Sequence, residues 1–211
     1  MKKICIVDYG VGNIHSAMKG LRRFTENVIL SEDPAEIADA SALVLPGQGA
    51  FQAGMEGLRV RGLLDTVKKT ALSGKPILGI CLGAQLLLEK GYEFGEWEGL
   101  SLLPGEVVHF PTLADGAKTP HMGWNAIEDV GRWKRTALEG LPDRAEMYFI
   151  HSYILKPSDP SHILAETEYG VIRFASVIGK GNIIGCQFHP EKSSTHGLRI
   201  VENFVKMVEQ K

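Results

Sequence analysis

The chain has 211 residues with a formal net charge of −2, and its hydrophobic and charged fractions are 44% and 23%. This length suits one α/β domain spanning residues 1–211, and the charge argues against a nucleic-acid partner. No apolar run is long enough to cross a membrane and no targeting segment is evident, which predicts a cytoplasmic protein. The three cysteines are too few and too widely spaced for a disulfide framework or a zinc site, so we expect neither metal nor cofactor.

Short apolar runs alternate with helical patterns through the first half of the chain. Strands are expected at Ile4–Val7, Val28–Leu30, Leu43–Leu45 and Ile77–Ile80, and helices at Ile14–Phe24, Pro34–Ala40, Gly62–Leu72 and Leu82–Glu89. Fully apolar strands joined by helical crossovers favour an α/β fold with an open, mainly parallel sheet and helices on both faces. Ligands of such sheets bind beyond the carboxyl ends of the strands.

The second half is richer in strands, so the complete sheet is expected to be mixed. Strands are predicted at Glu106–Phe110, Asn125–Val130, Glu146–Ser152, Ile163–Glu168, Phe174–Ile178 and Ile183–Phe188. The turn residues 179–182 predict a hairpin between the last two of these strands. A final helix is expected at Leu198–Val208, whose apolar residues recur on one face.

A cysteine stands between two glycines where an apolar strand gives way to a helix, in Gly79-Ile80-Cys81-Leu82-Gly83. Glycines at these positions leave room for a sharp strand-to-helix turn that raises the thiol above the sheet edge. The helix that follows points free N–H groups at the sulfur, which favours the nucleophilic thiolate. Cys81 is therefore a candidate nucleophile, although a free cysteine is more often a small core residue.

A candidate base follows the strand Ile183–Phe188, in the tripeptide His189-Pro190-Glu191. His189 could accept the Cys81 proton while Glu191 holds the imidazole in one tautomer, a nucleophile–base–orienter arrangement. His151, which follows Tyr148-Phe149-Ile150 and could also end a strand near the site, is a weaker candidate for the base than His189.

Acyl chemistry also needs donors for the oxyanion that develops in the transition state. The backbone N–H of Leu82 is one such donor by elbow geometry. We expect the second from the loop Pro46-Gly47-Gln48-Gly49, where glycines let the backbone approach a substrate. This loop lacks the spacing of either common glycine-rich phosphate-binding motif.

These motifs together resemble the class I (triad) glutamine amidotransferases. Further blocks narrow the resemblance to the glutaminase subunits of imidazole glycerol phosphate synthases, and they run from the first strand to the last loop. The blocks are Asp8-Tyr-Gly-Val-Gly-Asn13, Pro46-Gly-Gln-Gly49, Pro120-His-Met-Gly-Trp-Asn125, Phe149-Ile-His-Ser-Tyr153 and His189-Pro-Glu-Lys-Ser-Ser194.

The resemblance implies that Cys81 attacks the side-chain carboxamide of L-glutamine. His189, oriented by Glu191, would protonate the departing ammonia and then activate the water that hydrolyses the γ-glutamyl thioester. The residues implied to hold the glutamine are Gly49, Gln85, Glu93, His151, Ser152 and Tyr153, beside the oxyanion-hole residues Gly47, Gln48 and Leu82. Gln48 stands where the family typically has a small or β-branched apolar residue, which could change how easily the loop moves.

The resemblance also implies a partner that uses the ammonia. This partner would be a separate (β/α)₈ synthase, or cyclase, subunit that forms a heterodimer with the chain and makes imidazole glycerol phosphate and an aminoimidazole carboxamide ribonucleotide. The positions implied to face it are Asn13, Trp124, Tyr148 and Lys192.

Two other interpretations remain open from the sequence. The chain could be the glutaminase of another pathway, such as anthranilate or aminodeoxychorismate synthesis, which the Pro120–Asn125 and Lys192–Ser194 blocks disfavour. It could also be a catalytically silent regulatory domain of the same fold, which the intact Cys81, His189 and Glu191 disfavour.

Overall fold

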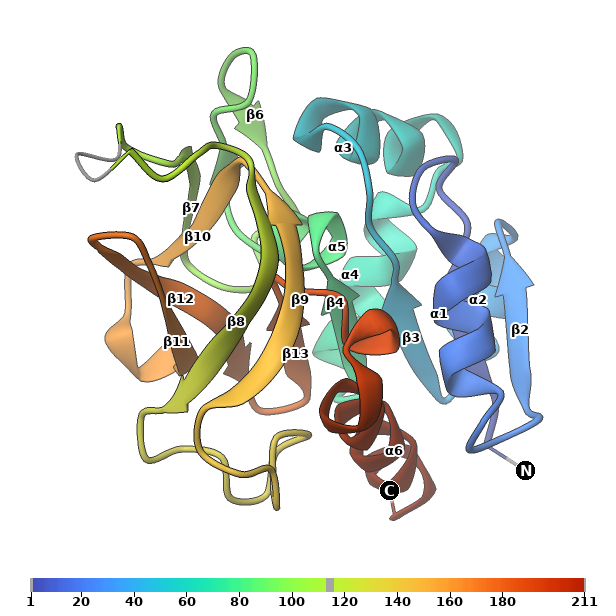
Figure 1. Ribbon diagram of the computed structural model, residues 1–211. Helices are drawn as coiled ribbons and strands as arrows, with labels where there is room; N and C mark the ends of the chain where they lie inside the picture. Colours follow the sequence, from blue (N-terminus) through green and yellow to red (C-terminus); the bar gives the residue numbers. More distant parts are fainter. Residues whose placement is uncertain (1, 113–115, 211) are drawn as a thin grey trace.

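The computed structural model describes residues 2–112 and 116–210 (Figure 1), so the two ends of the predicted 1–211 domain lie outside it. The strands are β1 (Ile4–Val7), β2 (Val28–Ser31), β3 (Ala42–Leu45), β4 (Ile77–Ile80), β5 (Lys90–Gly91), β6 (Trp97–Glu98), β7 (Gly105–His109), β8 (His121–Asp129), β9 (Ala145–His151), β10 (Tyr153–Pro157), β11 (Ile163–Tyr169), β12 (Ile172–Lys180) and β13 (Ile183–Cys186). The helices are α1 (Ile14–Leu21), α2 (Pro34–Asp39), α3 (Phe51–Val60), α4 (Leu64–Leu72), α5 (Leu82–Leu86) and α6 (Ser194–Gln210), with short 3₁₀ turns η1 (Pro160–His162) and η2 (Pro190–Lys192).

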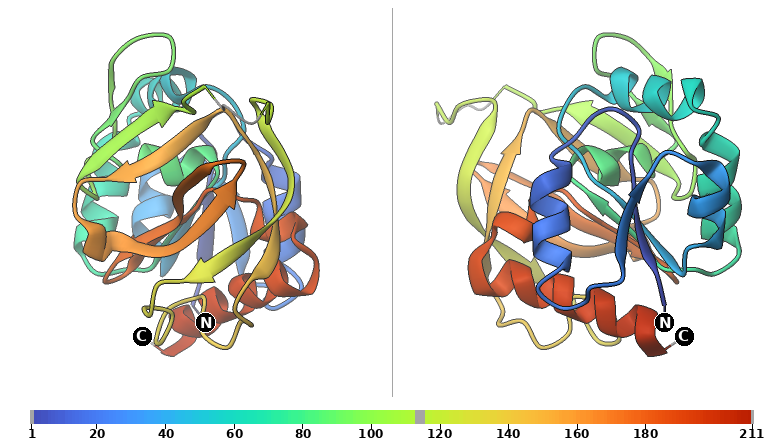
Figure 2. Two further views of the ribbon diagram at one scale, coloured as in Figure 1. Left: turned by 60° about the vertical axis from the view of Figure 1, so that its left-hand side comes forward. Right: turned by 90° about the vertical axis from the view of Figure 1, so that its right-hand side faces the viewer.

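The predicted α/β fold with a mixed open sheet is confirmed. The strand order is β2-β1-β3-β4-β13-β12-β10-β7-β5-β6, and the first five of these strands run parallel. The β12–β13 hairpin is antiparallel, as the turn residues predicted. Strands β7 to β12 form the antiparallel, strongly curved part of the sheet, which few helices cover (Figure 2, left).

Alternate residues of the parallel strands pack into two separate apolar layers. In β1, Ile4 and Ile6 join the layer beneath α1 and α6, whereas Cys5 and Val7 join the layer beneath α2, α3 and α4. Figure 2 (right) shows α1 and α2 on opposite sides of the first strands. This two-sided burial explains why the strands read as continuous apolar runs.

Helix α3 is missing from the sequence prediction because Gly54 and Gly57 are poor helix formers. Both are buried, and close packing accounts for them. A Cβ on Gly57 would stand 1.9 Å from the carbonyl oxygen of Tyr9, and one on Gly54 would stand 3.0 Å from the Leu86 side chain. Tertiary contacts therefore select glycine against its helical propensity.

Several predicted helix boundaries are also corrected: α1 ends at Leu21 instead of Phe24, and α6 begins at Ser194 instead of Leu198. The helix expected at Leu82–Glu89 ends at Leu86, because the carbonyl groups of Leu86 and Leu87 accept hydrogen bonds from the main chain of Leu100 and Leu102. The helix expected from Gly62 begins at Leu64, after a positive φ of 67° at Gly62. Strand β10 and the short strands β5 and β6 were not predicted.

Candidate functional site

Cys81 occupies a sharp turn between β4 and α5, as the sequence predicted. Its backbone has φ 50° and ψ −107°, a conformation that costs a non-glycine residue about 1–3 kcal/mol. The surrounding structure holds it there, since the Cys81 N–H donates a 2.7 Å hydrogen bond to the carbonyl of Cys186 at the end of β13. The side chain is largely buried, with 7% of the residue exposed.

The two glycines around Cys81 are required by close packing at the carboxyl ends of the parallel strands. A Cβ on Gly83 would stand 1.9 Å from the Leu45 carbonyl oxygen, and a Cβ on Gly79 would stand 2.6 Å from the Gly83 carbonyl oxygen. Larger residues would therefore push α5 away from the sheet, and the thiol would move with it.

His189 and Glu191 form a buried pair at the end of β13. Nδ1 of His189 and Oε1 of Glu191 are 2.9 Å apart, and the two side chains are only 1% and 2% exposed. The main chain around the pair is fixed by Ser193, whose hydroxyl donates to the His189 carbonyl at 2.6 Å and accepts from the Tyr148 N–H at 2.9 Å. The contact between Glu191 and Nδ1 can hold the imidazole ring in one orientation.

The electrostatic environment of His189 favours its protonated form. Burial alone lowers the pKa of His189, but the neighbouring Cys81 and Glu191 outweigh it and raise that pKa to about 9. Because Glu191 occupies Nδ1, the ring's other nitrogen, Nε2, is left for the cysteine; it is buried and has no hydrogen-bond partner among the described residues. Cys81 is among the groups that raise the pKa of this ring, so the thiol lies close to it.

A pocket of about 200 Å³ opens above Cys81. This volume lies below the roughly 300–1,000 Å³ of pockets for drug-sized ligands, so it suits a molecule of amino-acid size. Nine of its lining residues are positions singled out from the sequence: Gln48, Gly49, Cys81, Leu82, Gln85, Glu93, His151, Ser152 and Tyr153. Pro120 and Ile150 complete the lining and were not predicted.

Gly47 lies beneath the pocket instead of lining it. A Cβ at this residue would stand 2.4 Å from both the Gly83 nitrogen and the Ile80 carbonyl oxygen, so the loop is wedged against the Cys81 turn. Gln48 and Gly49, by contrast, are exposed, and Gly49 has a φ of 134°. The Gln48 side chain thus extends from the loop without disturbing its packing on the turn.

Glu93 brings a carboxylate to the pocket from the loop between β5 and β6. Its Oε2 accepts a 2.7 Å hydrogen bond from the N–H of Phe51, at the start of α3. The carboxylate is therefore held in one position, where it can bind an ammonium group of a ligand.

Gln187 lies beside Cys81 and was not predicted as a site residue. It is fully buried, and its amide Nε2 lies 3.8 Å from the Cys81 sulfur while its Oε1 accepts from Gln85 Nε2 at 3.3 Å. Gln85 Nε2 also lies 3.4 Å from the carbonyl oxygen of Tyr153. Strand alternation was an available signal, because residues two apart face the same way and Gln187 precedes His189 by two.

His151, the weaker candidate for the base, has a different environment. Its Nδ1 is 2.8 Å from the Tyr153 carbonyl oxygen, and its Nε2 is 3.1 Å from Nδ1 of His121. His121, like Gln187, was not predicted as a site residue. Burial, reinforced by the charges of His121 and His189, lowers the pKa of His151 to about 3 against the opposing effect of the Tyr153 carbonyl. His151 is therefore neutral near pH 7, whereas His189 is poised to exchange a proton.

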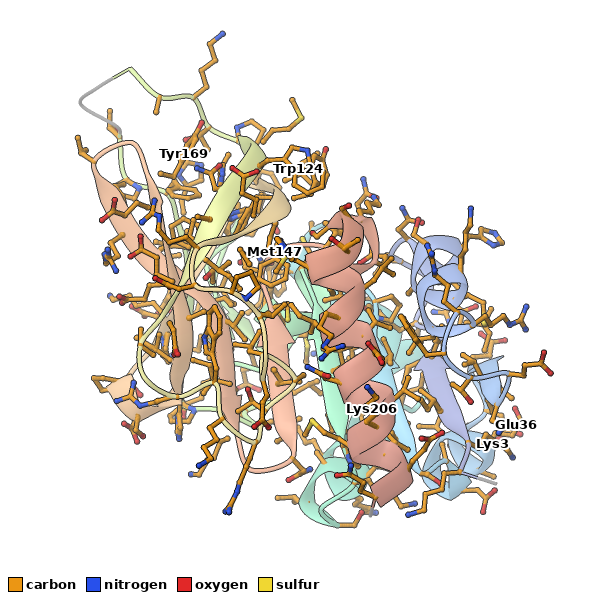
Figure 3. All side chains as sticks on the ribbon, turned by 60° about the horizontal axis from the view of Figure 1, so that its bottom comes forward. Lys3, Glu36, Trp124, Met147, Tyr169 and Lys206 are labelled. Atoms are coloured by element: carbon orange, nitrogen blue, oxygen red, sulfur yellow. The ribbon has the colours of Figure 1, made fainter. Side chains whose placement is uncertain are left out.

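The four residues expected to face a partner lie on adjoining elements. Trp124 and Tyr148 are paired across β8 and β9 with ring centroids 6.0 Å apart, and Trp124 is 49% exposed. Figure 3 shows Trp124 projecting from the upper part of the molecule in that view. Lys192 ends η2, which packs against β9 and α1, and Asn13 caps the N-terminus of α1.

Across residues 2–112 and 116–210, no three His, Cys, Asp or Glu side chains are grouped so that they could hold a metal ion. In the same residues, every helix is too short or too polar to span a membrane.

Comparison with known proteins places this geometry in a family. Residues 5–208 match the model of the "Glutamine amidotransferase class-I" family. The chain is 44% identical over 213 residues to "Imidazole glycerol phosphate synthase subunit HisH 1" of Legionella pneumophila (strain Lens), covering 98% of this chain and 100% of the relative. It is 47% identical over 208 residues to the HisH subunit of Symbiobacterium thermophilum, covering 99% and 95%.

Solved structures share the fold at lower sequence identity. A structure titled "Crystal structure of glutamine amidotransferase" aligns with a TM-score of 0.74 at 21% identity, covering 97% of this chain and 98% of the other. PurLQS from Thermotoga maritima aligns with a TM-score of 0.74 at 17% identity, covering 98% and 99%. The cysteine turn, the buried histidine–glutamate pair and the full-length family match agree, and the chain belongs to the class I glutamine amidotransferases.

Proposed function

We propose that the chain, as one domain, is the glutamine amidotransferase subunit of an imidazole glycerol phosphate synthase in histidine biosynthesis. It hydrolyses L-glutamine and supplies ammonia to a synthase subunit. The observation that carries this proposal is the amino-acid-sized pocket above Cys81, next to the His189–Glu191 pair. The curated relatives, which cover nearly the whole chain and are named HisH, support the choice of pathway.

The first chemical step forms a thioester and releases ammonia. The Cys81 sulfur attacks the side-chain carbonyl carbon of glutamine, and the carbonyl oxygen becomes an oxyanion. The Leu82 N–H and the loop at Gly47–Gly49 supply the hydrogen-bond donors for this oxyanion. His189 then gives its proton to the amide nitrogen, the C–N bond breaks and ammonia leaves. The raised pKa of His189 means that the required proton is present at neutral pH.

The second step hydrolyses the γ-glutamyl thioester. His189, neutral after giving up its proton, accepts one from a water molecule while the water oxygen attacks the thioester carbonyl. The C–S bond breaks, glutamate leaves, and the Cys81 thiolate and protonated His189 are restored. Throughout both steps, Glu191 keeps the ring in the tautomer that presents Nε2 to the reacting atoms.

Substrate recognition follows from the lining of the pocket. The fixed carboxylate of Glu93 suits the α-amino group of glutamine, and Gln85 with the main chain of Ser152 suits its remaining polar groups.

The ammonia acceptor is, in this proposal, a (β/α)₈ synthase subunit that forms a cytoplasmic heterodimer with this chain. The exposed Trp124 beside Tyr148 gives the molecule an aromatic patch of the kind that anchors protein interfaces. Asn13 and Lys192 lie on elements next to this patch, so one docked partner could contact all four residues.

A reconstitution experiment tests this function. The purified chain is mixed with the synthase subunit of imidazole glycerol phosphate synthase, and complex formation, glutamate release and imidazole glycerol phosphate production are measured. We expect a 1:1 complex that makes the product from glutamine. Absence of a complex at micromolar concentrations, or pairing with an anthranilate synthase subunit instead, would reject the assignment to this pathway.

Replacing Trp124 by alanine should weaken the complex by at least about tenfold in Kd, because truncating a central aromatic anchor commonly removes about 2 kcal/mol or more of binding energy. Titration calorimetry or light scattering with the synthase subunit measures this change. Leu72→Ala is the control, since Leu72 is 81% exposed on α4, on the side opposite β8 (Figure 2, right). Equal affinity of the Trp124→Ala and wild-type chains would remove Trp124 from the interface.

A further inference from the structure

Tyr9 is a fully buried tyrosine whose hydroxyl donates a hydrogen bond to the carbonyl oxygen of Pro46. It follows β1, and Pro46 follows β3, the parallel neighbour of β1. The contact therefore joins two strand ends at the edge of the sheet where Cys81 also lies. Pro46 is the residue that begins the loop proposed to bind the oxyanion.

The hydroxyl of Tyr9 remains a donor under working conditions. Burial, together with the nearby charge of Cys81, raises the pKa of Tyr9 above its usual range, so the phenol stays protonated. A phenylalanine would fill the same space in the apolar layer to which Tyr9 belongs. Without a hydroxyl at this position, the buried Pro46 carbonyl would lose its donor, and leaving such a group unpaired is unfavourable.

The main chain of Tyr9, which carries the phenol, is also held in place. The Tyr9 carbonyl oxygen lies against Gly57 of α3, where a Cβ would stand only 1.9 Å away, and it accepts a 3.4 Å hydrogen bond from Arg61. On the other side, Gly12 packs so closely on Pro46 that a Cβ there would stand 3.2 Å from the Pro46 carbonyl oxygen. The donor and the acceptor thus have little freedom to separate.

The loop beyond Pro46 divides into a clamped part and an open part. Gly47 is wedged against the Cys81 turn, whereas Gln48 and Gly49 are exposed and line the pocket. A fixed Pro46 carbonyl determines the orientation of the peptide plane that leads into Gly47. The Gly47 N–H lies in that same plane, so holding the carbonyl also fixes the direction of this donor.

We propose that Tyr9 is a positioning residue for glutamine hydrolysis, whose hydroxyl holds the Pro46 carbonyl and thereby places the loop N–H that stabilises the oxyanion. Tyr9 does not touch the substrate, since it is absent from the pocket lining. It acts on the transition state through the loop, where small displacements of a donor are costly. This inference rests on the proposed function.

The test compares Tyr9→Phe with wild type in the complex with the synthase subunit. We expect kcat for glutamine hydrolysis to fall about tenfold or more while KM stays within about twofold, because an oxyanion donor acts only in the transition state. Alkylation of Cys81 by iodoacetamide should proceed at the wild-type rate, since the nucleophile itself is untouched. A merely structural defect would change KM and alkylation together with kcat.

The matched control is Tyr169→Phe, which also removes a tyrosine hydroxyl that donates to a backbone carbonyl, that of Lys118 at 2.8 Å. This variant should keep kcat and KM within about twofold of wild type, because Lys118 is outside the loop and the pocket. A Tyr9→Phe enzyme with wild-type kcat, or one whose KM and alkylation rate change as much as kcat, overturns the proposal.

A second readout does not depend on activity. Amide hydrogen exchange on the chain alone should be faster over residues 47–49, the loop residues that carry an amide hydrogen, in Tyr9→Phe than in wild type, and unchanged in Tyr169→Phe. Unchanged exchange over residues 47–49 in Tyr9→Phe overturns the proposal even if the wild-type chain fails as a glutaminase. Failure of the wild-type complex to hydrolyse glutamine would instead overturn the proposed function.

Discussion

Cys81→Ala should lower the glutaminase kcat of the complex by roughly 10⁴-fold or more, because no thioester can form without the sulfur. Synthesis of imidazole glycerol phosphate from added ammonium salts should stay within about twofold of wild type, since this route bypasses Cys81. Parallel assays with glutamine and with ammonium chloride measure the two activities. A variant that loses only the nucleophile loses the glutamine-dependent activity alone, whereas a variant that loses the complex loses more than that activity.

Cys5→Ala is the matched control for this prediction. Cys5 is also a buried thiol, but it lies on β1 in the core, and burial raises its pKa to about 12, so the thiol stays protonated. We expect glutamine-dependent activity within about twofold of wild type. Iodoacetamide should label wild type and Cys5→Ala at one site, Cys81, and leave Cys81→Ala unlabelled. Continued glutamine hydrolysis by Cys81→Ala would contradict the assignment of the nucleophile.

Much of the site was predictable because its residues follow apolar strands. Cys81 follows β4 and His189 follows β13, and these strands are parallel neighbours in the sheet. Ligands of open α/β sheets bind beyond the carboxyl ends of the strands. Identifying the two strands from their composition was therefore enough to expect both residues at this edge. The pairing of His189 with Glu191 was predictable for a simpler reason, since only a proline separates the two residues in the chain.

Buried residues that contact distant parts of the chain left no comparable pattern in the sequence. Tyr9 and Gln187 are buried polar residues whose partners, Pro46 and Cys81, are distant in sequence. Their contacts depend on which strands are neighbours, and the order of strands was not predicted. Helix α3 was not predictable for a related reason, because the close approach of Gly57 to Tyr9 cannot be distinguished in one sequence from a glycine that breaks a helix.

Glu191→Gln should lower the glutaminase kcat by about 10³- to 10⁴-fold, the size of effect known for the equivalent change in serine-protease triads. The amide can present its NH₂ group to Nδ1 of His189, which moves the ring proton to Nε2, where a lone pair is needed to accept a proton. Steady-state assays of the complex measure the loss. Glu202→Gln on α6 is the control, because Glu202 pairs with Arg199 and Lys206 at the surface.

The pH behaviour of His189 should change with the same substitution. Glu191 is one of two groups that raise the pKa of His189 to about 9, so its neutralisation should lower that pKa. Less of the imidazole will then be protonated at about pH 8 than in wild type. Titration of the imidazole signals by NMR measures the shift, and an unchanged pKa with a kcat within about tenfold of wild type would contradict the orienting role.

Combining Cys81→Ala with Glu191→Gln tests whether Glu191 acts through the nucleophile or independently of it. If Glu191 acts only through His189, and His189 acts only on Cys81 and its thioester, then Glu191→Gln has nothing left to impair once the sulfur is gone. The double variant Cys81→Ala/Glu191→Gln should therefore be no slower with glutamine than Cys81→Ala alone. A further loss in the double variant would mean that Glu191 also supports a step that does not need the nucleophile, such as binding glutamine.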